Sequence, residues 1–501
     1  MPSSPGDSRS PSYHQGNDQQ PLDGPRLHVY HVLKSIGLVT AYNSSIDVKL
    51  ILAQRLVRVF AYGLVTLILA AYLAALKISE TQIGIFFGLT LVGDLVMVMA
   101  LTQIADAIGR KAILILGAVL MTMSGVVFAT SGNYWVLLVA AVFGVISPSA
   151  TEVGLFKSIE ESALFTIVTH DLVDILSWYS TAEFASVTVG LIISGGIMDD
   201  LQQTLAWDFV PACRAVFLVY AGVGVVKIVL SSCMSWKIEA WHDTKHQDGT
   251  HRDSEQEEVY ETAATIPEQA PLLPSEPIPV TPKTSVPAMR AGTSVFSLDQ
   301  EERLVLLKLC ALLAVDSCAV GLSSVPWQTY MVRTRFDVPD AKLGAIFMLG
   351  NGLGAVGTLF SSSPARRLGN LITLAVTLLP SAIILLFFGL AFNLPLMLLL
   401  IASESFLSPI YLAPRNTFIS RILTRSKRTA SLGIITMVKL LTNATGSFFT
   451  GFWADRDMFW LAFVVAGSLK ILYVFGILYA FLAVDRRLAH EQEEREDTGS
   501  D

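Results

Sequence analysis

The amino-acid sequence predicts an all-α membrane protein whose twelve transmembrane helices form two pseudosymmetric six-helix bundles. Three observations predict this fold class: the composition, the spacing of long apolar segments, and an internal repeat. Hydrophobic residues make up 52% of the 501 residues and charged residues 15%, and the mean hydropathy is +0.55. This composition is too apolar and too poor in charge for an ordinary soluble protein. We therefore expect lipid to surround most of the chain.

The apolar segments have the length of membrane spans, since a helix needs roughly 20 mostly apolar residues to cross a bilayer. About twelve such spans occur, in two sets of six. The first set lies at approximately 50–76, 82–104, 111–130, 134–157, 171–197 and 211–234. The second set lies at approximately 303–331, 340–363, 369–392, 394–420, 429–452 and 458–484. We expect one bundle at residues 50–239 and a second at residues 301–485.

Three segments lie outside the predicted bundles. The segment 240–300 carries an acidic run followed by a series of prolines, a composition that cannot bury a core, so we expect a disordered linker. We expect disordered tails at 1–49 and 486–501 as well. The N-terminal tail lacks the basic and then apolar profile of a cleaved signal peptide, so the first membrane helix would serve as the signal.

Basic residues predict the orientation of the spans, because cytoplasmic loops are enriched in Lys and Arg. If the spans alternate, most basic loop residues lie on one side, together with both termini and the linker. These residues are Arg110, Lys111, Arg366, Arg367, Arg425, Lys427, Arg428, Arg486 and Arg487. Arg333 and Arg335, after the seventh span, fall on the other side. We predict that both termini and the linker are cytosolic.

The internal repeat is the strongest of the three observations. The matched pairs are Gly84 with Gly344, Ala105 with Ala365 and Gly109 with Gly369 at an offset of 260, Ser147-Pro148 with Ser408-Pro409 at 261, and residues 190–199 with 446–455 at 256. Three helix pairs that keep nearly one offset indicate a duplicated six-helix unit. Parallel repeats of this kind mark one large transporter architecture.

The charged loop between the second and third spans carries a family signature. It follows the pattern G-x-x-x-D-[RK]-x-G-[RK]-[RK] at Asp106, Gly109, Arg110 and Lys111, and departs from it at Thr102 and Ala107. Through this loop and its repeat, the chain resembles the transporters of the major facilitator superfamily over all twelve spans. Residues 147–160 are similar to a segment of fungal and bacterial facilitators, some of them multidrug-like and vacuolar. We predict a divergent member of that kind.

The resemblance implies that this loop forms part of a cytoplasmic gate. Gly109 permits a sharp turn, and Asp106 could meet helix N-termini or arginines across the cytoplasmic face and latch it when the transporter opens outward. The alternative is a plain basic anchor on the cytosolic side. We assign Arg58, Glu152 and Arg415 to the same gate. Glu152 and Arg415 follow equivalent Ser-Pro steps, so they could pair across the interface or simply hold helices together.

Ionisable residues inside the spans form the candidate substrate and proton pathway. Each costs about 2.5–3.5 kcal/mol on insertion scales, so it is a functional candidate until a structural partner is found. These residues are Asp94, Glu183, Asp316, Glu404 and Lys439. Glu183 and Lys439 lie 256 positions apart, so an acid would face a base across the central cavity that the resemblance implies. The acid could load and release a proton; the alternative is a permanent buried salt bridge.

Other polar and aromatic side chains have a simpler interpretation. We expect Arg55 to extend towards the lipid headgroups. The aromatic residues Trp178, Tyr179, Trp327 and Tyr330 could stack on a ligand, but an interfacial aromatic belt is the expected place for most of them.

Partners and location follow from the remaining motifs. The sequence predicts no cofactor, no metal site and no nucleic-acid partner, and it lacks the loop G-x-x-x-x-G-K-[ST] that binds ATP, so we do not expect an enzyme. The predicted linker carries an acidic dileucine pattern at Glu268, Leu272 and Leu273 that a sorting adaptor could bind. This pattern favours the vacuolar membrane over the plasma membrane.

These observations predict a secondary active transporter that moves a small molecule by alternating access and is coupled to protons. Export or vacuolar sequestration is the favoured direction. The alternatives are a passive uniporter and a transporter-like sensor or receptor that does not transport. A cavity with both acid and base suits zwitterions, organic anions and amphipathic drugs alike.

Overall fold

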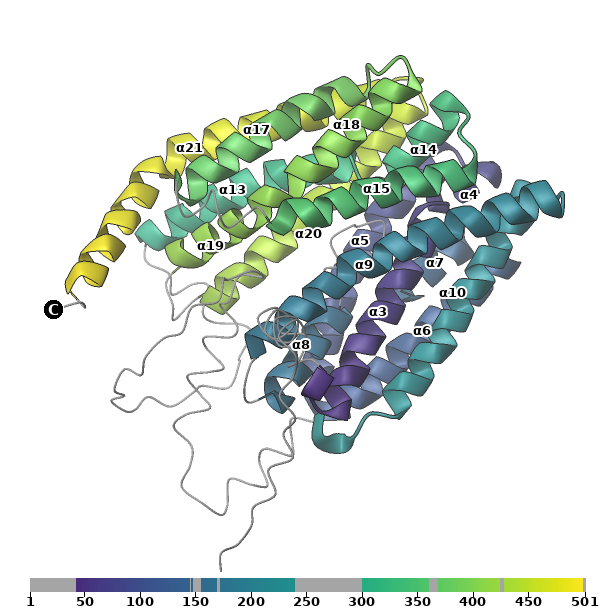
Figure 1. The fold of residues 1–501 in the computed structure, drawn as a ribbon, viewed down its shortest axis with the longest axis horizontal. Coiled ribbons are helices and arrows are strands. Elements are labelled where there is room, and N and C mark those ends of the chain that lie inside the picture. Colours follow the sequence, from purple (N-terminus) through teal and green to yellow (C-terminus); the bar gives the residue numbers. More distant parts are fainter. Residues whose placement is uncertain are drawn as a thin grey trace, which may run out of the picture.

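In the computed structural model the described residues are 42–144, 146, 155–168, 172–238, 300–359, 368–423 and 428–498. Within these ranges the regular structure is helical and contains no strand. The helices form two groups, coloured purple to teal and green to yellow in Figure 1. The predicted N-terminal tail up to residue 41 and the predicted linker up to residue 299 lie outside the described ranges.

The N-terminal half contains two spans that are not single straight helices. Its elements are α3 (Ile46–Thr66), α4 (Leu69–Ala75), α5 (Glu80–Ile108), α6 (Arg110–Thr130), α7 (Tyr134–Gly144), α8 (Leu155–Ile167), α9 (Leu172–Asp199), the π-helix η1 (Asp200–Thr204), α10 (Phe209–Ser232) and the 3₁₀-helix η2 (Trp236–Ile238). α3 and α4 are bent by 42° relative to each other and together fill the first predicted span. α7 and α8 occupy the fourth predicted span, and α8 continues past its predicted end.

The C-terminal half contains two interrupted spans. Its elements are α13 (Gln300–Leu322), α14 (Val325–Phe336), α15 (Asp340–Leu359), α17 (Asn370–Phe388), α18 (Leu394–Leu407), the 3₁₀-helix η4 (Ser408–Tyr411), α19 (Leu412–Ile422), α20 (Arg428–Ala454) and α21 (Phe459–Thr498). The Ser408-Pro409 step begins η4, because proline lacks the N–H that an α-helix needs at this point. α13 gives way to α14 at Ser323 and Ser324, and Pro326 lies in the first turn of α14.

Helix is present at all twelve predicted spans. Among the described residues, nine helical stretches are long and apolar enough to cross a bilayer, and α3 with α4 makes a tenth. The other two positions hold α7 with α8, and α15. The predicted all-α, multi-pass fold is therefore confirmed. The predicted disorder of the C-terminal tail is wrong up to Thr498, because α21 continues as a helix to that residue.

The two halves are built alike. α3 packs on α9 and α6 on α10, and the equivalent pairs in the second half are α13 with α20 and α17 with α21. The repeat extends to single turns: Gly109 and Gly369 have φ values of 101° and 83°, and each directly precedes the first residue of α6 or α17. Glycine adopts positive φ without steric cost, so the sharp turn expected at Gly109 is present and recurs 260 positions later.

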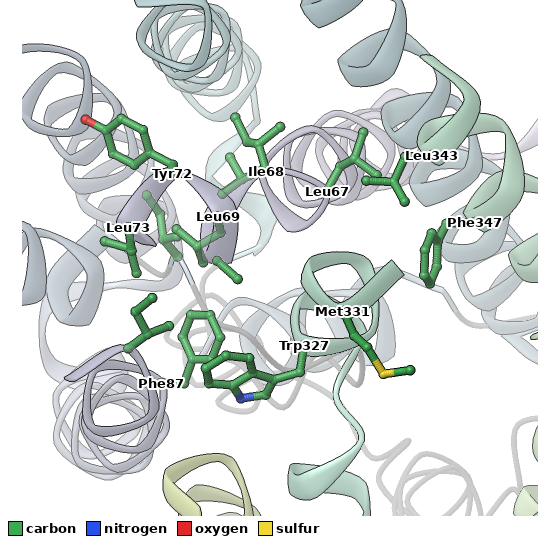
Figure 2. Packing of buried hydrophobic residues seen from close by; sticks show 14 of the residues in the cluster. Leu67, Ile68, Leu69, Tyr72, Leu73, Phe87, Trp327, Met331, Leu343 and Phe347 are labelled. Carbon is green, nitrogen blue, oxygen red and sulfur yellow. The ribbon is translucent and has the colours of Figure 1, made fainter. Parts of the chain in front are cut away.

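The two ends of the molecule differ in how the halves meet. We call the end at which α3 and α13 begin the linker side, and the opposite end the far side. On the far side one hydrophobic core contains residues of both halves. Phe87 of α5 and the fully buried Trp327 of α14 have ring centroids 5.3 Å apart, with Met331 and Phe347 nearby (Figure 2). On the linker side each half has a core of its own within the described residues.

Glycines allow the close approach of helices between the halves. α5 packs on α20, and α9 packs on α15. A Cβ atom added at Gly84 would lie 2.7 Å from the carbonyl oxygen of Phe448, and one added at Gly195 would lie 2.6 Å from that of Asp340. Since Cβ atoms essentially never come closer than 3.0 Å to other heavy atoms, the far side closes tightly because these positions lack side chains.

Candidate functional site

A buried ion pair joins three helices of the N-terminal half. Nη2 of Arg58 on α3 lies 2.6 Å from Oε2 of Glu160 on α8. The hydroxyl of Tyr179 on α9 donates to the same oxygen at 2.7 Å. Glu160 is fully buried and Arg58 nearly so. Arg58 is thus bonded within its own half, and Glu160, which the sequence analysis did not select, is its partner.

A second ion pair lies one helical turn away. Nη2 of Arg55 is 2.5 Å from Oε2 of Glu183 on α9, and the Arg55 guanidinium lies 4.5 Å from the centroid of the Tyr179 ring. Arg55 is fully buried, so the expectation that it extends to the lipid headgroups is wrong. Tyr179 is also buried and does not belong to an interfacial belt. Glu183 pairs with Arg55 of its own half, rather than facing Lys439 as an isolated acid.

Lys227 of α10 adds a third cation to this cluster. Its side chain is completely buried and lies within electrostatic range of Glu160, Arg58 and Arg55. The sequence analysis missed it, because the family resemblance places the sixth helix outside the cavity. A lysine within a long apolar segment was nevertheless a usable signal.

The C-terminal half contains an ion pair equivalent to Arg58–Glu160, with the two charges exchanged. Oδ2 of Asp316 on α13 lies 2.8 Å from Nη1 of Arg415 on α19, and both side chains are buried. Asp316 follows Arg58 by 258 positions and Arg415 follows Glu160 by 255, close to the offsets of the repeat. In each half an ion pair therefore joins the first and fourth helices, with the signs of the charges exchanged.

The remaining charged residues of the predicted pathway have different surroundings. Lys439 on α20 is partly buried and lies within electrostatic range of Arg415 and Asp316. Oε1 of Glu404 is 3.9 Å from Nζ of Lys470 on α21, a loose ion pair within the C-terminal half. The buried Asp94 lies within electrostatic range of the Tyr220 hydroxyl.

The predicted gate residues make contacts within their own halves. Nη1 of Arg110 donates to the carbonyl oxygen of Ile238 at 3.2 Å, and Nζ of Lys111 donates to that of Met234 at 2.6 Å. Both residues thus hold the segment that follows α10. Arg415 bonds to Asp316. Glu152 and the side chain of Asp106 lie outside the described part of the chain, so the predicted Glu152–Arg415 pair and the Asp106 latch remain predictions.

Polar contacts on the far side link the two halves. Asp340 is the first residue of α15. Its Oδ1 forms an ion pair with Nη1 of Arg333 at 2.9 Å and its Oδ2 accepts from Nε2 of Gln202 at 2.7 Å, so its carboxylate connects both halves. The Arg333 guanidinium also lies 3.7 Å from the centroid of the Phe209 ring of α10. Arg333, which contradicted the charge rule for loops, is therefore engaged in holding the halves together.

Two further hydrogen bonds cross the same interface. The hydroxyl of Tyr330 donates to Oε1 of Glu80 at 2.9 Å, and Oγ1 of Thr81 donates to Oδ2 of Asp455 at 3.0 Å. Deeper in the membrane, Nδ2 of Asn351 donates to Oγ1 of Thr188 at 2.9 Å. The halves are thus bonded from the far side inwards, while the ion pairs Arg58–Glu160 and Asp316–Arg415 stay within single halves.

Two helical bundles joined at one end, with ionisable residues buried inside each, define a multi-pass membrane protein of the transporter type. The family model of the Major Facilitator Superfamily matches residues 51–403, and the chain belongs to this family. A relative from Saccharomyces cerevisiae, the uncharacterized membrane protein YJR124C, is 32% identical over 452 residues, which cover 89% of this chain and 96% of the relative.

Solved structures of transporters share the fold. The nucleoside transporter NupG has a TM-score of 0.64 at 10% identity and covers 87% of this chain and 99% of its own. A D-xylose-proton symporter has a TM-score of 0.62 at 15% identity, and the match covers 86% of this chain and 97% of the symporter. A bacterial homologue of the human lysosomal transporter Spinster, in an inward-facing and occupied conformation, has a TM-score of 0.61 at 12% identity. The match covers 86% of this chain and 96% of the homologue. The chain is accordingly a membrane transporter by family and fold, not an enzyme.

Proposed function

We propose that this transporter moves a small molecule across the bilayer by alternating access and that the movement is coupled to protons. The ion pairs Arg58–Glu160 and Asp316–Arg415 tie helices together inside each half, which favours movement of the halves as rigid units. The contacts around Asp340 and Trp327 join the halves on the far side and would have to separate for the far side to open. We interpret the described arrangement as the state that is open on the linker side.

The observation that carries the coupling proposal is the ion pair between Arg55 and Glu183. The Glu183 side chain is 18% exposed, whereas the side chains of Glu404 and Asp316 are 13% and 1% exposed. Glu183 is thus the most exposed of these three carboxylates, and water can deliver a proton to it most readily. Of the acids in the predicted pathway, Glu183 is the one that we assign as the proton carrier.

Protonation of Glu183 would remove the nearest counter-charge of the fully buried Arg55, while Glu160 stays within electrostatic range. Leaving one partner of a buried pair wholly uncompensated costs roughly 3–5 kcal/mol, which is the upper limit for this loss. Two conformations of a transporter typically differ by only a few kcal/mol, so this penalty is large enough to change which state is populated. We propose that the proton acts on the conformational equilibrium by this route.

The other predicted residues retain their proposed roles. Asp94, Asp316, Glu404 and Lys439 belong to the proposed pathway. Arg58, Glu152, Arg415 and the loop from Asp106 through Gly109, Arg110 and Lys111 belong to the proposed gate, whose latch would form in the opposite state. We further propose export or sequestration across the vacuolar membrane with cytosolic termini, supported by the acidic dileucine pattern at Glu268, Leu272 and Leu273.

Proteoliposomes containing the full chain test the proposal. A growth screen of deletion and overexpression strains against toxic compounds supplies the substrate, and uptake is then measured with and without an imposed pH gradient. We expect accumulation only with the gradient, and loss of accumulation but not of substrate exchange in Glu183→Gln. The exposed Asp200→Asn is the matched control. Equilibration without accumulation would identify a passive uniporter, and binding without uptake a sensor; either result contradicts the proposal.

A further inference from the structure

We propose that Lys439, together with Arg415, binds the negatively charged group of the transported molecule, which makes the cargo a small organic anion. This inference rests on the proposed transport function and narrows its substrate class. Three side chains from three helices form the site. Asp316 of α13 pairs with Arg415 of α19, and Lys439 of α20 lies within electrostatic range of both. With Lys439 protonated, they carry two positive charges and one negative charge.

Asp316 already has a partner in this cluster. Its Oδ2 accepts from Nη1 of Arg415 at 2.8 Å, and the Arg415 guanidinium also lies 5.1 Å from the centroid of the Tyr411 ring. Lys439 makes no ion pair within 4.0 Å among the described residues. Other cations of this half are paired: Lys470 with Glu404 and Arg333 with Asp340. Lys439 is thus a partly buried ammonium group left with spare positive charge beside a satisfied arginine.

The surroundings of this ammonium group are also incompletely bonded. Oδ1 of Asp316, Nε of Arg415 and the hydroxyl of Tyr473 are buried and have no hydrogen-bond partner among the described residues. Buried polar atoms in folded proteins are nearly always bonded, so several atoms without a protein partner in one place call for a partner from outside the chain, such as water or a ligand. A bound anion would supply an acceptor for Lys439 and would allow the neighbouring network to rearrange.

The alternative substrate classes fit this site less well. An organic cation would have to approach two positive charges that share one carboxylate, and like charges repel strongly inside a membrane because the local dielectric constant is low. A neutral molecule would leave the charge of Lys439 uncompensated. A lysine ammonium acts as a point charge with three donors, which suits a carboxylate or a phosphoryl group.

Thermal unfolding of the detergent-solubilised full chain tests the site without requiring transport. The probes are benzoate, benzamide and benzylamine, which share a ring and differ in charge, together with succinate and inorganic phosphate to separate carboxylates from phosphate. We expect at least one anion to raise the Tm of the unsubstituted chain, and benzamide and benzylamine to leave it unchanged. Lys439→Gln should weaken anion binding roughly 10- to 150-fold, the effect of losing one charge-assisted hydrogen bond.

Two further variants separate charge from general surface effects. Lys439→Arg should retain most of the binding because it keeps the charge, and the exposed Lys308→Gln should bind as the unsubstituted chain does. As a measurement that does not depend on a folded variant, an amine-specific reagent should modify Lys439 of the unsubstituted chain more slowly when the stabilising anion is present, as read by mass spectrometry.

Three results would overturn the inference. The first is that no anion raises the Tm, and the second is that benzylamine stabilises better than benzoate. The third is an anion affinity of Lys439→Gln within about twofold of that of the unsubstituted chain, which is the spread expected for a neutral substitution. Failure of the transport proposal would look different. Anions would then bind at Lys439 but would not be carried across proteoliposome membranes.

Discussion

Adding one methyl group at Gly195 should separate the two halves on the far side. A Cβ atom there would lie 2.6 Å from the carbonyl oxygen of Asp340 and 3.2 Å from Cα of Gly344, both on α15. The first distance is about 0.8 Å short of the 3.4 Å at which ordinary contact begins. The obstacle is backbone, so α9 and α15 would have to move apart in the state that we describe.

The cost of this overlap can be set against the balance between the two states. Overpacking by one methylene group costs about 1–3 kcal/mol. If the contact is absent when the far side is open, the substitution shifts the ratio of the two states by roughly 5- to 150-fold towards the open far side. The neighbouring Gly196→Ala is the matched control, because a Cβ atom there meets nothing within 4 Å.

Distances between pairs of spin labels report the shift. In a background without the four native cysteines, labels at Leu205 and Phe392 report the far side, and labels at Ile108 and Leu368 report the linker side. All four side chains are exposed. Gly195→Ala should lengthen the first distance and shorten the second. Identical distance distributions for Gly195→Ala and Gly196→Ala would refute the reasoning.

Three further substitutions test individual contacts. Glu160→Gln removes one charge of a buried pair, so the free energy of unfolding in detergent should fall by roughly 3–5 kcal/mol. The exposed Asp200→Asn should change it by less than about 1 kcal/mol, and equal effects would show that the ion pair does not stabilise the N-terminal half. Trp327→Ala leaves a cavity at a fully buried position, so the free energy of unfolding, followed by thermal unfolding, should fall by roughly 3–5 kcal/mol. The control is Trp135→Ala, at a side chain that is 66% exposed. A similar loss of stability in the control would contradict the prediction. Tyr330→Phe removes the hydrogen bond to the Glu80 carboxylate between the halves, which is worth about 1.5–3 kcal/mol. The far-side label distance should lengthen, and no change would mean that this bond does not hold the far side closed.

The sequence was sufficient for the fold because the signals for membrane spans are local. A run of apolar residues predicts a span by its length, and glycine at an equivalent turn predicts the repeat, as Gly109 and Gly369 illustrate. The interruptions at Ser408-Pro409 also had a local cause in proline. The helical end of α21 was missed because the apolar run that predicts the last span ends before the helix does.

The partners of the buried charges could not be predicted in the same way. Pairing depends on how each helix is rotated and which helix packs beside it, so Glu183 was matched with Lys439 by offset alone, while Arg55 was its partner. One signal was available: Arg55 and Arg58 lie three residues apart and share a helix face, so a buried Arg58 implied a buried Arg55. The role of Asp340 depends on which end of the molecule is closed, and a single sequence does not reveal that.

A reversible cross-link across the far side tests alternating access most directly. The side chains of Thr81 and Asp455 are within hydrogen-bond distance across the two halves, so Thr81→Cys with Asp455→Cys places two thiols where a disulfide can hold the far side closed. Uptake of the transported molecule into proteoliposomes should stop when the disulfide forms and recover when it is reduced, while each single variant transports under both conditions. Uptake that continues at the same rate with the disulfide intact would contradict the account.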